Sequence, residues 1–339
     1  MSKQLEVEPE FAEKISSDDL GWLLEKLADR VEKEIVLIAK NPNLYRRIER
    51  IVFTLPTRHI IYHGDSRNLS FIPSESVHLV VNSPPYWIVK KYKPIPGQLG
   101  VIKDYNKFLE ELGKVWREVY RVLVPGGRLI IVVGDVLLPR RKYGRHRVIP
   151  LHSDIIKQCT SIGFEYLAPI IWFKIGNVSR EVPGRSGFLG KPYMPNAVIK
   201  NDIEYILMFR KPGYRSVSRV RMKLSVIPEK LFKEWFTQIW RLLGESTKHH
   251  PAPFPLELAE RLIRMYSYVY DTVLDPFMGT GTTLLAAART GRNSIGVEID
   301  PEYVKYAYNR LRKEAQSLFG KREIILKEMS NEQSYQGMG

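Results

Sequence analysis

The chain has 339 residues, of which 44% are hydrophobic, so it is long enough to bury at least one full core. Its formal net charge is +15, from 52 Lys and Arg against 37 Asp and Glu, which makes a polyanion such as nucleic acid a natural partner. The single cysteine, Cys159, excludes a disulfide framework and any multi-cysteine zinc site.

Residues 1–58 are predicted to form a helical N-terminal extension. They lack the apolar core of a signal peptide, and no stretch of the chain has the roughly 18 uninterrupted apolar residues of a membrane span, so a cytoplasmic protein without membrane contact is expected. The pattern predicts a helix packed on the main body or on a second subunit, with no chemical role. Apolar residues recur at spacings of three and four at Leu20, Leu24, Leu27, Val31, Ile35 and Ile38.

From residue 59 onward, short β-rich runs alternate with helical stretches such as 107–123 and 256–269. This alternation predicts an α/β fold whose sheet is mostly parallel and covered on both faces. In such a sheet, ligands bind beyond the carboxyl ends of the strands. The runs cover residues 59–65, 78–86, 128–135, 164–174, 204–211, 272–277 and 293–300.

The segment NSPPYW (82–87) ends the second run. Two consecutive prolines cannot continue a strand ladder, because neither has an N–H group. Pro84 and Pro85 would fix the backbone so that Ser83 and a carbonyl point into the cleft, while Tyr86 offers a flat face. The alternative interpretation is a rigid turn without chemistry.

The segment LDPFMGTGTT (274–283) ends the sixth run with Asp275 at its tip and turns through Gly279 and Gly281 into a helix. A P-loop would need a Gly-Lys-Ser or Gly-Lys-Thr ending, and a dinucleotide fingerprint would need a third glycine; neither is present. A nucleoside cofactor without a pyrophosphate fits better, with Glu298 at the next strand end accepting hydrogen bonds from ribose hydroxyls. S-adenosylmethionine fits this description.

The combination of SPPY (83–86) and DPFMGTGTT (275–283) resembles the DNA amino-methyltransferases, which modify cytosine N4 or adenine N6. Other blocks extend the resemblance over residues 59–314, among them GDSRNL (64–69), GQLGV (97–101) and GRNSIGVEID (291–300). SPPY precedes the glycine turn, as in the permuted subgroup called beta. The resemblance therefore implies a Rossmann-like, S-adenosylmethionine-dependent fold with a seven-stranded, mostly parallel sheet and a circularly permuted motif order.

The resemblance also implies a division of the chain after the N-terminal extension. Residues 59–174 are expected to form the catalytic half and residues 248–320 the cofactor-binding half. Between them, residues 175–247 are expected to form an inserted DNA-recognition region that includes a sheet strand near 204–211. Residues 321–339 are expected to be a C-terminal tail.

The resemblance implies that the Ser83 side chain and the Pro84 carbonyl accept hydrogen bonds from the two amino hydrogens of the base. These bonds would localise the nitrogen lone pair for direct in-line transfer of the methyl group. The base must leave the duplex, and Tyr86 is expected to stack on it. No metal is expected. The catalytic set is Ser83, Pro84, Pro85 and Tyr86, and the cofactor-binding set is Asp65, Asp275, Pro276, Phe277, Gly279, Gly281, Thr282 and Glu298.

The choice of base rests on Ser83, because a serine at this position is associated in the family with cytosine N4, and Asp or Asn with adenine N6. Cytosine N4 is expected, and adenine N6 stays open. Cytosine C5 methylation would need a Pro-Cys nucleophile loop, whereas Cys159 lies in an apolar helical context without a preceding proline. The residues also leave open an RNA or protein amino-methyltransferase and a non-catalytic DNA-binding protein.

Duplex DNA is the expected partner, in a restriction-modification system with a possible cognate endonuclease, and the chain is expected to be a monomer or a homodimer. Basic clusters near the cleft would supply phosphate contacts, which carry no sequence information. The candidates are Lys90, Lys91, Arg140, Arg141, Lys142, Arg145, Arg147, Arg215, Arg219 and Arg221.

Overall fold

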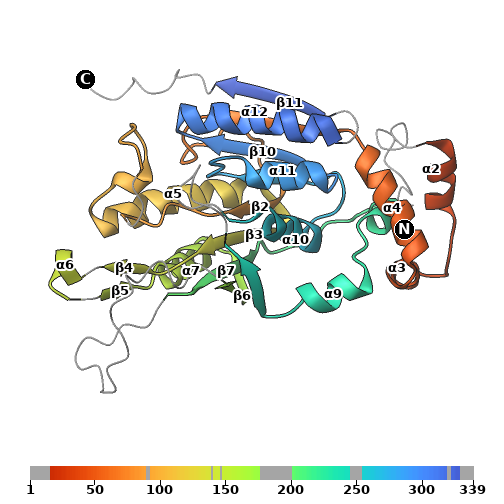
Figure 1. Cartoon of the computed structure of the whole chain (residues 1–339), viewed down its shortest axis with the longest axis horizontal. Helices are drawn as coiled ribbons and strands as arrows, with labels where there is room; N and C mark the ends of the chain where they lie inside the picture. The colour runs from red at the N-terminus through yellow and green to blue at the C-terminus, as the bar shows by residue number, and fades with distance from the viewer. Residues whose placement is uncertain are drawn as a thin grey trace, which may run out of the picture.

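The computed structural model describes residues 16–88, 92–138, 140–145, 147–175, 201–244, 254–318 and 322–328. Within these ranges, nine strands form one sheet in the order β11-β1-β10-β9-β2-β3-β7-β6-β8, and β4 and β5 form a separate hairpin (Figure 1). The strands are β1 (Thr57–His63), β2 (Val77–Asn82), β3 (Leu123–Val133), β4 (Val136–Leu138), β5 (Arg147–Ile149), β6 (Glu165–Ile175), β7 (Ile203–Arg210), β8 (Ile239–Leu243), β9 (Thr272–Asp275), β10 (Asn293–Glu298) and β11 (Arg322–Glu328).

Helices cover both faces of the sheet, as predicted. On one face, α10 and α11 pack on β2, β9 and β10, and α12 packs on β1 and β11; on the other face, α5 and α7 pack on β3, β6 and β7. The helices are α2 (Ser17–Leu24), α3 (Val31–Lys40), α4 (Pro42–Thr54), α5 (Tyr105–Val122), α6 (Arg140–Tyr143), α7 (Leu151–Ile162), α8 (Arg219–Leu224), α9 (Glu229–Trp235), α10 (Leu256–Tyr266), α11 (Thr282–Arg289) and α12 (Pro301–Leu318), with a 3-10 turn η1 (Leu99–Val101).

All seven predicted β-rich runs are strands of the main sheet, and the sheet is mostly parallel. Among the described strands of the main sheet, only β7 runs antiparallel to its neighbours, β3 and β6. The predicted number of strands was wrong, because β8 and β11 add one strand at each edge. Fully buried apolar residues of β2 and β3, such as Val80, Val81, Ile130 and Ile131, alternate between the two faces and so form a core on each side.

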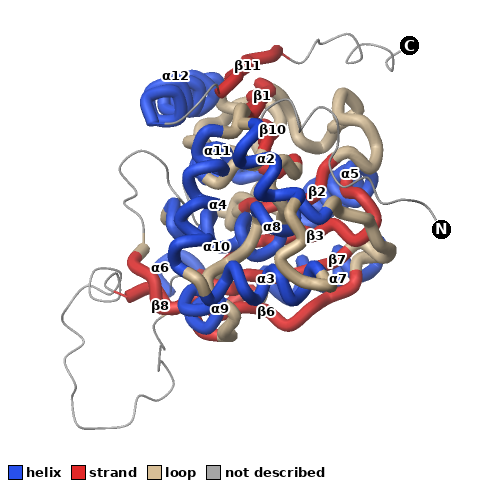
Figure 2. Tube along the Cα trace, turned by 90° about the vertical axis from the view of Figure 1, so that its right-hand side faces the viewer, coloured by secondary structure: helices blue, strands red, loops and turns tan. Residues whose placement is uncertain are grey.

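The predicted N-terminal helical extension is confirmed over α2, α3 and α4, which pack against α8 at the right of Figure 1. Figure 2, turned to face this side, shows these helices gathered around α8. Ile38 and Leu23 are fully buried there, but residues 25–30 interrupt the single predicted helix, and Leu24 is exposed. The extension therefore belongs to the body of the protein. No helix in the described ranges is long and apolar enough to cross a membrane.

The described part of the predicted recognition region is built into the fold. Two of its segments, β7 and β8, are strands of the main sheet, and α8 packs on the N-terminal helices. Residues 176–200 lie outside the described residues. The predicted C-terminal tail was also wrong in part, because Arg322–Glu328 pair in parallel with β1. The helical context predicted for Cys159 is confirmed, since Cys159 is fully buried in α7.

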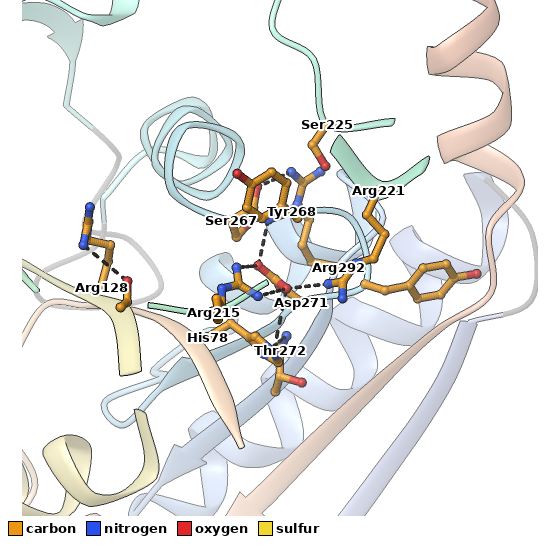
Figure 3. Close-up of polar contacts among 12 residues, drawn as sticks. His78, Arg128, Arg215, Arg221, Ser225, Ser267, Tyr268, Asp271, Thr272 and Arg292 are labelled. Carbon is orange, nitrogen blue, oxygen red and sulfur yellow. Dashed lines mark hydrogen bonds and ion pairs between the residues drawn. The ribbon is translucent and has the colours of Figure 1, made fainter. Parts of the chain in front are cut away.

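A buried charge cluster lies at the amino ends of β2 and β9, around Asp271 (Figure 3). The fully buried Asp271 carboxylate accepts hydrogen bonds from Arg215, Arg221 and the backbone N–H of Tyr268. Burial alone would raise the pKa of Asp271, but the Arg215 hydrogen bond and the nearby positive charges hold it below its ordinary value. Asp271 thus fixes the loop before β9 to the segment before α8.

This arrangement gives three of the predicted DNA-contact residues partners inside the protein, so their contact with DNA stays a prediction. Arg215 and Arg221 both form ion pairs with Asp271, and Arg219 pairs with the fully buried Glu34 of α3. Each of the three arginine side chains is at most 21% exposed. A basic run in the sequence does not reveal buried acids elsewhere in the chain. Here those acids form ion pairs with all three arginines, which gives the arginines a structural role.

Replacing Asp271 by Ala should lower the free energy of unfolding by about 3–5 kcal/mol. The reason is that the positive charges of Arg215 and Arg221 lose their shared carboxylate partner in a largely buried site. Urea titration followed by circular dichroism measures this loss. The control is Asp29→Ala, which breaks an exposed pair with Lys33 and should cost about 1 kcal/mol or less. Equal losses in the two variants would contradict the structural role of Asp271.

Candidate active site

A cavity lies at the carboxyl ends of β1, β2, β9 and β10, where ligand chemistry was predicted. Its wall combines two carboxylates, two tyrosines and several apolar groups, and the loop before α5 closes one side. The lining residues are Gly64, Asp65, Ser66, Ser83, Pro85, Tyr92, Gly97, Gln98, Leu99, Pro276, Phe277, Val297, Glu298, Ile299 and Tyr303.

Glu298, at the end of β10, holds the glycine turn in place. One carboxylate oxygen accepts the backbone N–H of Gly279 at 2.8 Å, and the other accepts those of Ile299 and Asp300 at 2.9 Å each. Its backbone carbonyl accepts the N–H of Gly64 at 2.9 Å, beyond the end of β1. Burial raises the pKa of Glu298 above its ordinary value. One residue therefore joins three strand ends around the cavity.

Asp275, at the end of β9, supports the turn from behind and does not line the cavity. It is 2% exposed and accepts hydrogen bonds from the Phe277 N–H at 3.0 Å and the Thr283 hydroxyl at 2.6 Å. Gly279 and Gly281 have φ angles of 51° and 79°, in the left-handed region that favours glycine, and α11 begins directly after them. The acid and the glycines together shape the turn between β9 and α11.

Asp65, after β1, lines the cavity and is paired with Arg67, whose Nε lies 2.9 Å from Oδ2. Arg67 also pairs with Glu111 of α5, and the pKa of Glu111 is lowered to about 2, chiefly by the hydrogen bond from Lys114 and then by Arg67. Gly97 allows the loop before α5 to approach Asp65 closely, since the φ of Gly97 is 86° and a Cβ there would lie 2.9 Å from Asp65 Oδ2. The guanidinium group of Arg67 is thus neutralised by two acids.

The SPPY tetrapeptide follows β2, beside the glycine turn, as the strand order requires. Ser83 and Pro85 line the cavity, and Pro84 is buried. Tyr86 is 8% exposed, and its hydroxyl lies 3.3 Å from the carbonyl of Val132 and 3.2 Å from Ser83 Oγ. Because its ring has little free face, the stacking of Tyr86 on a base stays a prediction.

The structure thus brings six of the predicted residues to the cavity wall: Asp65, Ser83, Pro85, Pro276, Phe277 and Glu298. Five others support the wall from behind or beside it: Pro84, Tyr86, Asp275, Gly279 and Gly281. Thr282 accepts a hydrogen bond from Arg310 at 3.1 Å. Sequence reasoning missed Tyr92, Gln98, Leu99 and Tyr303, although the block GQLGV signalled two of them.

Polar residues that the sequence did not predict lie beyond the carboxyl end of β3. The Nδ1 atom of His152 lies 2.6 Å from Asp135 Oδ1, and the imidazole stacks on Tyr205 with ring centroids 3.9 Å apart. On the neighbouring strands, Glu204 pairs with Lys174. These groups extend the polar surface from the tetrapeptide toward β6.

The remaining basic candidates lie on the hairpin that follows β3. The side chains of Arg141, Lys142, Arg145 and Arg147 are exposed on α6, on β5 and on the turn between them, at the left of Figure 1. The hairpin leaves the sheet at the carboxyl end of β3, next to the cavity end of β2. Its role in DNA binding stays a prediction. Lys90, Lys91 and the side chain of Arg140 lie outside the described residues.

A family model described as DNA methylase matches residues 77–309 of this chain. Type II methyltransferase M.MjaI of Methanocaldococcus jannaschii is 40% identical over 276 residues, which cover 73% of this chain and 88% of that protein. Type II methyltransferase M.MthZI of Methanothermobacter thermautotrophicus is 35% identical over 303 residues, which cover 82% of each chain.

Two solved structures are similar to this fold. TTHA0409 of Thermus thermophilus, a candidate DNA modification methylase complexed with S-adenosyl-L-methionine, has 48% identity and a TM-score of 0.66, covering 80% of this chain and all of that chain. PvuII DNA methyltransferase, which is cytosine-N4-specific, has 21% identity and a TM-score of 0.54, covering 79% of this chain and 96% of that chain. At that identity the second similarity shows the fold alone.

Asp275 gives a prediction about pH. Burial raises its pKa to about 7, so the folded protein keeps a proton that the unfolded chain releases near pH 4. Stability should therefore fall as the pH rises from about 4 to about 7, and Asp275→Asn should remove this dependence. Relative to wild type, the variant should gain on the order of 4 kcal/mol between pH 4 and pH 8.

Denaturant titrations of both proteins at several pH values measure this difference. The matched control is Asp29→Asn, at an exposed position, which should follow the wild-type profile. If the Asp275→Asn profile runs parallel to that of wild type, the carboxyl of Asp275 is not the group responsible.

Proposed function

The chain belongs to the DNA methylase family of N6 and N4 amino-methyltransferases, and from that membership we propose that it methylates the exocyclic N4 of cytosine in duplex DNA. S-adenosylmethionine is the methyl donor. The observation that carries the choice of cytosine is Ser83, which stands at the first position of the tetrapeptide and lines the cavity. Hydroxyl and carboxylate are both acceptors, so this choice rests on the association of serine with cytosine N4 in the family.

The cavity wall suits S-adenosylmethionine. Its described lining includes the carboxylates of Asp65 and Glu298 but no Lys or Arg, and the nearby Arg67 is neutralised by Asp65 and Glu111. A ligand with positive charge and hydroxyl groups is therefore favoured over one with a pyrophosphate. We assign Glu298 to the ribose side of the cofactor, Asp65 to the adenine side, and Pro276 and Phe277 to packing against it. When bound, the cofactor supplies a methyl group on a sulfonium.

The amino nitrogen of cytosine is a poor nucleophile, because its lone pair is delocalised into the ring. In our proposal, Ser83 Oγ and the Pro84 carbonyl each accept one amino hydrogen, which turns the lone pair toward the methyl group. Rate enhancement then comes from positioning and from acceptors directed at the positive charge that develops on nitrogen. A strong general base is not required, because the methylated ammonium is acidic enough to lose its proton to water.

Duplex DNA must bind with the target base flipped out of the helix. We propose that the exposed side chains of Arg141, Lys142, Arg145 and Arg147 contact phosphates beside the cavity, since the hairpin projects from the same end of the sheet. The similarity to type II methyltransferases supports a place in a restriction-modification system, acting on DNA in the cytoplasm beside a cognate endonuclease.

The deciding experiment is to incubate the purified protein with unmethylated duplex DNA and S-adenosylmethionine, digest the DNA to nucleosides and identify the product by mass spectrometry. N4-methylcytosine is expected. N6-methyladenine would keep the family and the mechanism but overturn the choice made on Ser83. Methyl transfer to RNA alone, or to no substrate, would contradict the proposed function.

Ser83→Ala should lower the single-turnover rate roughly 100-fold or more, because it removes an acceptor that acts on charge developing in the transition state. The affinity for S-adenosylmethionine, measured by calorimetry, should stay within about twofold of wild type. The matched control is Ser70→Ala, at an exposed serine, which should leave both quantities unchanged. A large loss of cofactor affinity in Ser83→Ala would contradict the assigned role.

A further inference from the structure

The hydroxyl of Tyr86 has three polar neighbours. It lies 3.3 Å from the carbonyl oxygen of Val132 and 3.2 Å from Ser83 Oγ. The third neighbour is the side chain of Glu204 on β7, which adjoins Gly134 on the same side as the Tyr86 ring. Burial, and then the Glu204 charge, hold the pKa of Tyr86 well above its ordinary value, so the phenol keeps its proton.

Counting protons fixes the direction of these hydrogen bonds. The phenol has a single hydrogen, and the Val132 carbonyl, which lies within hydrogen-bond distance, can only accept it. The phenol oxygen can receive a hydrogen from one neighbour alone, the hydroxyl of Ser83. Ser83 therefore donates its hydrogen to Tyr86, and its lone pairs remain for groups in the cavity.

Glu204 has an ion-pair partner of its own. It is 8% exposed and pairs with Lys174 on β6, whose ammonium also lies 5.2 Å from the centre of the Trp172 ring. Gly134 leaves room for the side chains of Glu204 and Tyr86, since a Cβ there would lie 3.3 Å from Glu204 Cγ and 3.7 Å from Tyr86 Cε2. The ion pair therefore stands directly behind the tetrapeptide.

The direction of the Ser83 hydroxyl matters for the reaction. A serine free to rotate can present its own hydrogen to the amino nitrogen, and that hydrogen bond would occupy the lone pair that must attack the methyl group. A serine whose hydrogen is held elsewhere can only accept. The orientation thus favours the transition state over an unproductive hydrogen-bonded complex.

We propose that the Tyr86 hydroxyl, with Glu204 and Lys174 behind it, is a positioning device that keeps Ser83 a hydrogen-bond acceptor toward the target amino group. This inference rests on the proposed function, since it needs an amino nitrogen in the cavity. It holds for cytosine N4 and adenine N6 alike, because both carry two hydrogens. Tyr86 thereby acts through its hydroxyl, a role separate from stacking of its ring.

The test is a double-mutant cycle between Tyr86→Phe and Ser83→Ala, read as single-turnover methylation rates with saturating DNA and cofactor. Tyr86→Phe keeps the ring and should slow wild type about 5- to 10-fold, with cofactor affinity unchanged. In the Ser83→Ala background it should have no further effect, because Ser83 is the group through which the hydroxyl acts. Equal slowing in both backgrounds would overturn the inference.

Glu204→Gln provides an independent arm. The glutamine amide can donate a hydrogen to the phenol oxygen and so compete with Ser83, which should slow wild type at least as much as Tyr86→Phe and leave Ser83→Ala unaffected. The matched control is Glu165→Gln on β6, a 45% exposed carboxylate paired with Arg210, which should keep the wild-type rate. A wild-type rate for Glu204→Gln would overturn the part assigned to Glu204.

The two proposals fail in different ways. If wild type methylates no nucleoside, the proposed function fails and this inference fails with it. If wild type is active and the cycle is additive, the function stands and only the positioning role of Tyr86 is lost.

Discussion

The contact between the Glu298 carboxylate and the backbone N–H of Gly279 is the interaction on which the geometry of the site depends. It joins the end of β10 to the turn after β9, and the Glu298 backbone in turn binds the segment after β1. The carboxylate is held by three backbone N–H groups, which fix its orientation at the cavity wall. Ser83, which directly follows the neighbouring strand β2, therefore lies in a cavity wall whose backbone is held by these hydrogen bonds.

The two ends of the sheet carry different kinds of buried charge. At the amino ends, Asp271 is saturated by arginines and holds loops and helices together. At the carboxyl ends, Asp275 and Glu298 are held by hydroxyl and backbone groups without a cation among the described residues, which keeps their pKa values high. Buried acid is thus paired with cations where it holds the fold together, whereas the two acids at the cavity end have hydroxyl and backbone partners among the described residues.

The sequence was sufficient to predict the seven central runs and the residues at their carboxyl ends, because strands buried on both faces and glycine turns leave strong local patterns. The edge strands β8 and β11 were missed because they are short or largely exposed; Leu243, for example, is 68% exposed. The ion pairs of Arg215, Arg219 and Arg221 could not be predicted for another reason. Their acidic partners, Asp271 and Glu34, lie at least 50 residues away in the chain, and only the folded structure brings them together.

The neutralised state of Arg67 has a consequence for selectivity inside a cell. ATP and related nucleotides share the adenosine half of S-adenosylmethionine and compete for any pocket that recognises it. A triphosphate entering this cavity would meet Asp65 and Glu298 and find the guanidinium group of Arg67 already held by two acids. The described lining therefore offers a triphosphate no cationic side chain, which disfavours its binding relative to a ligand that carries positive charge.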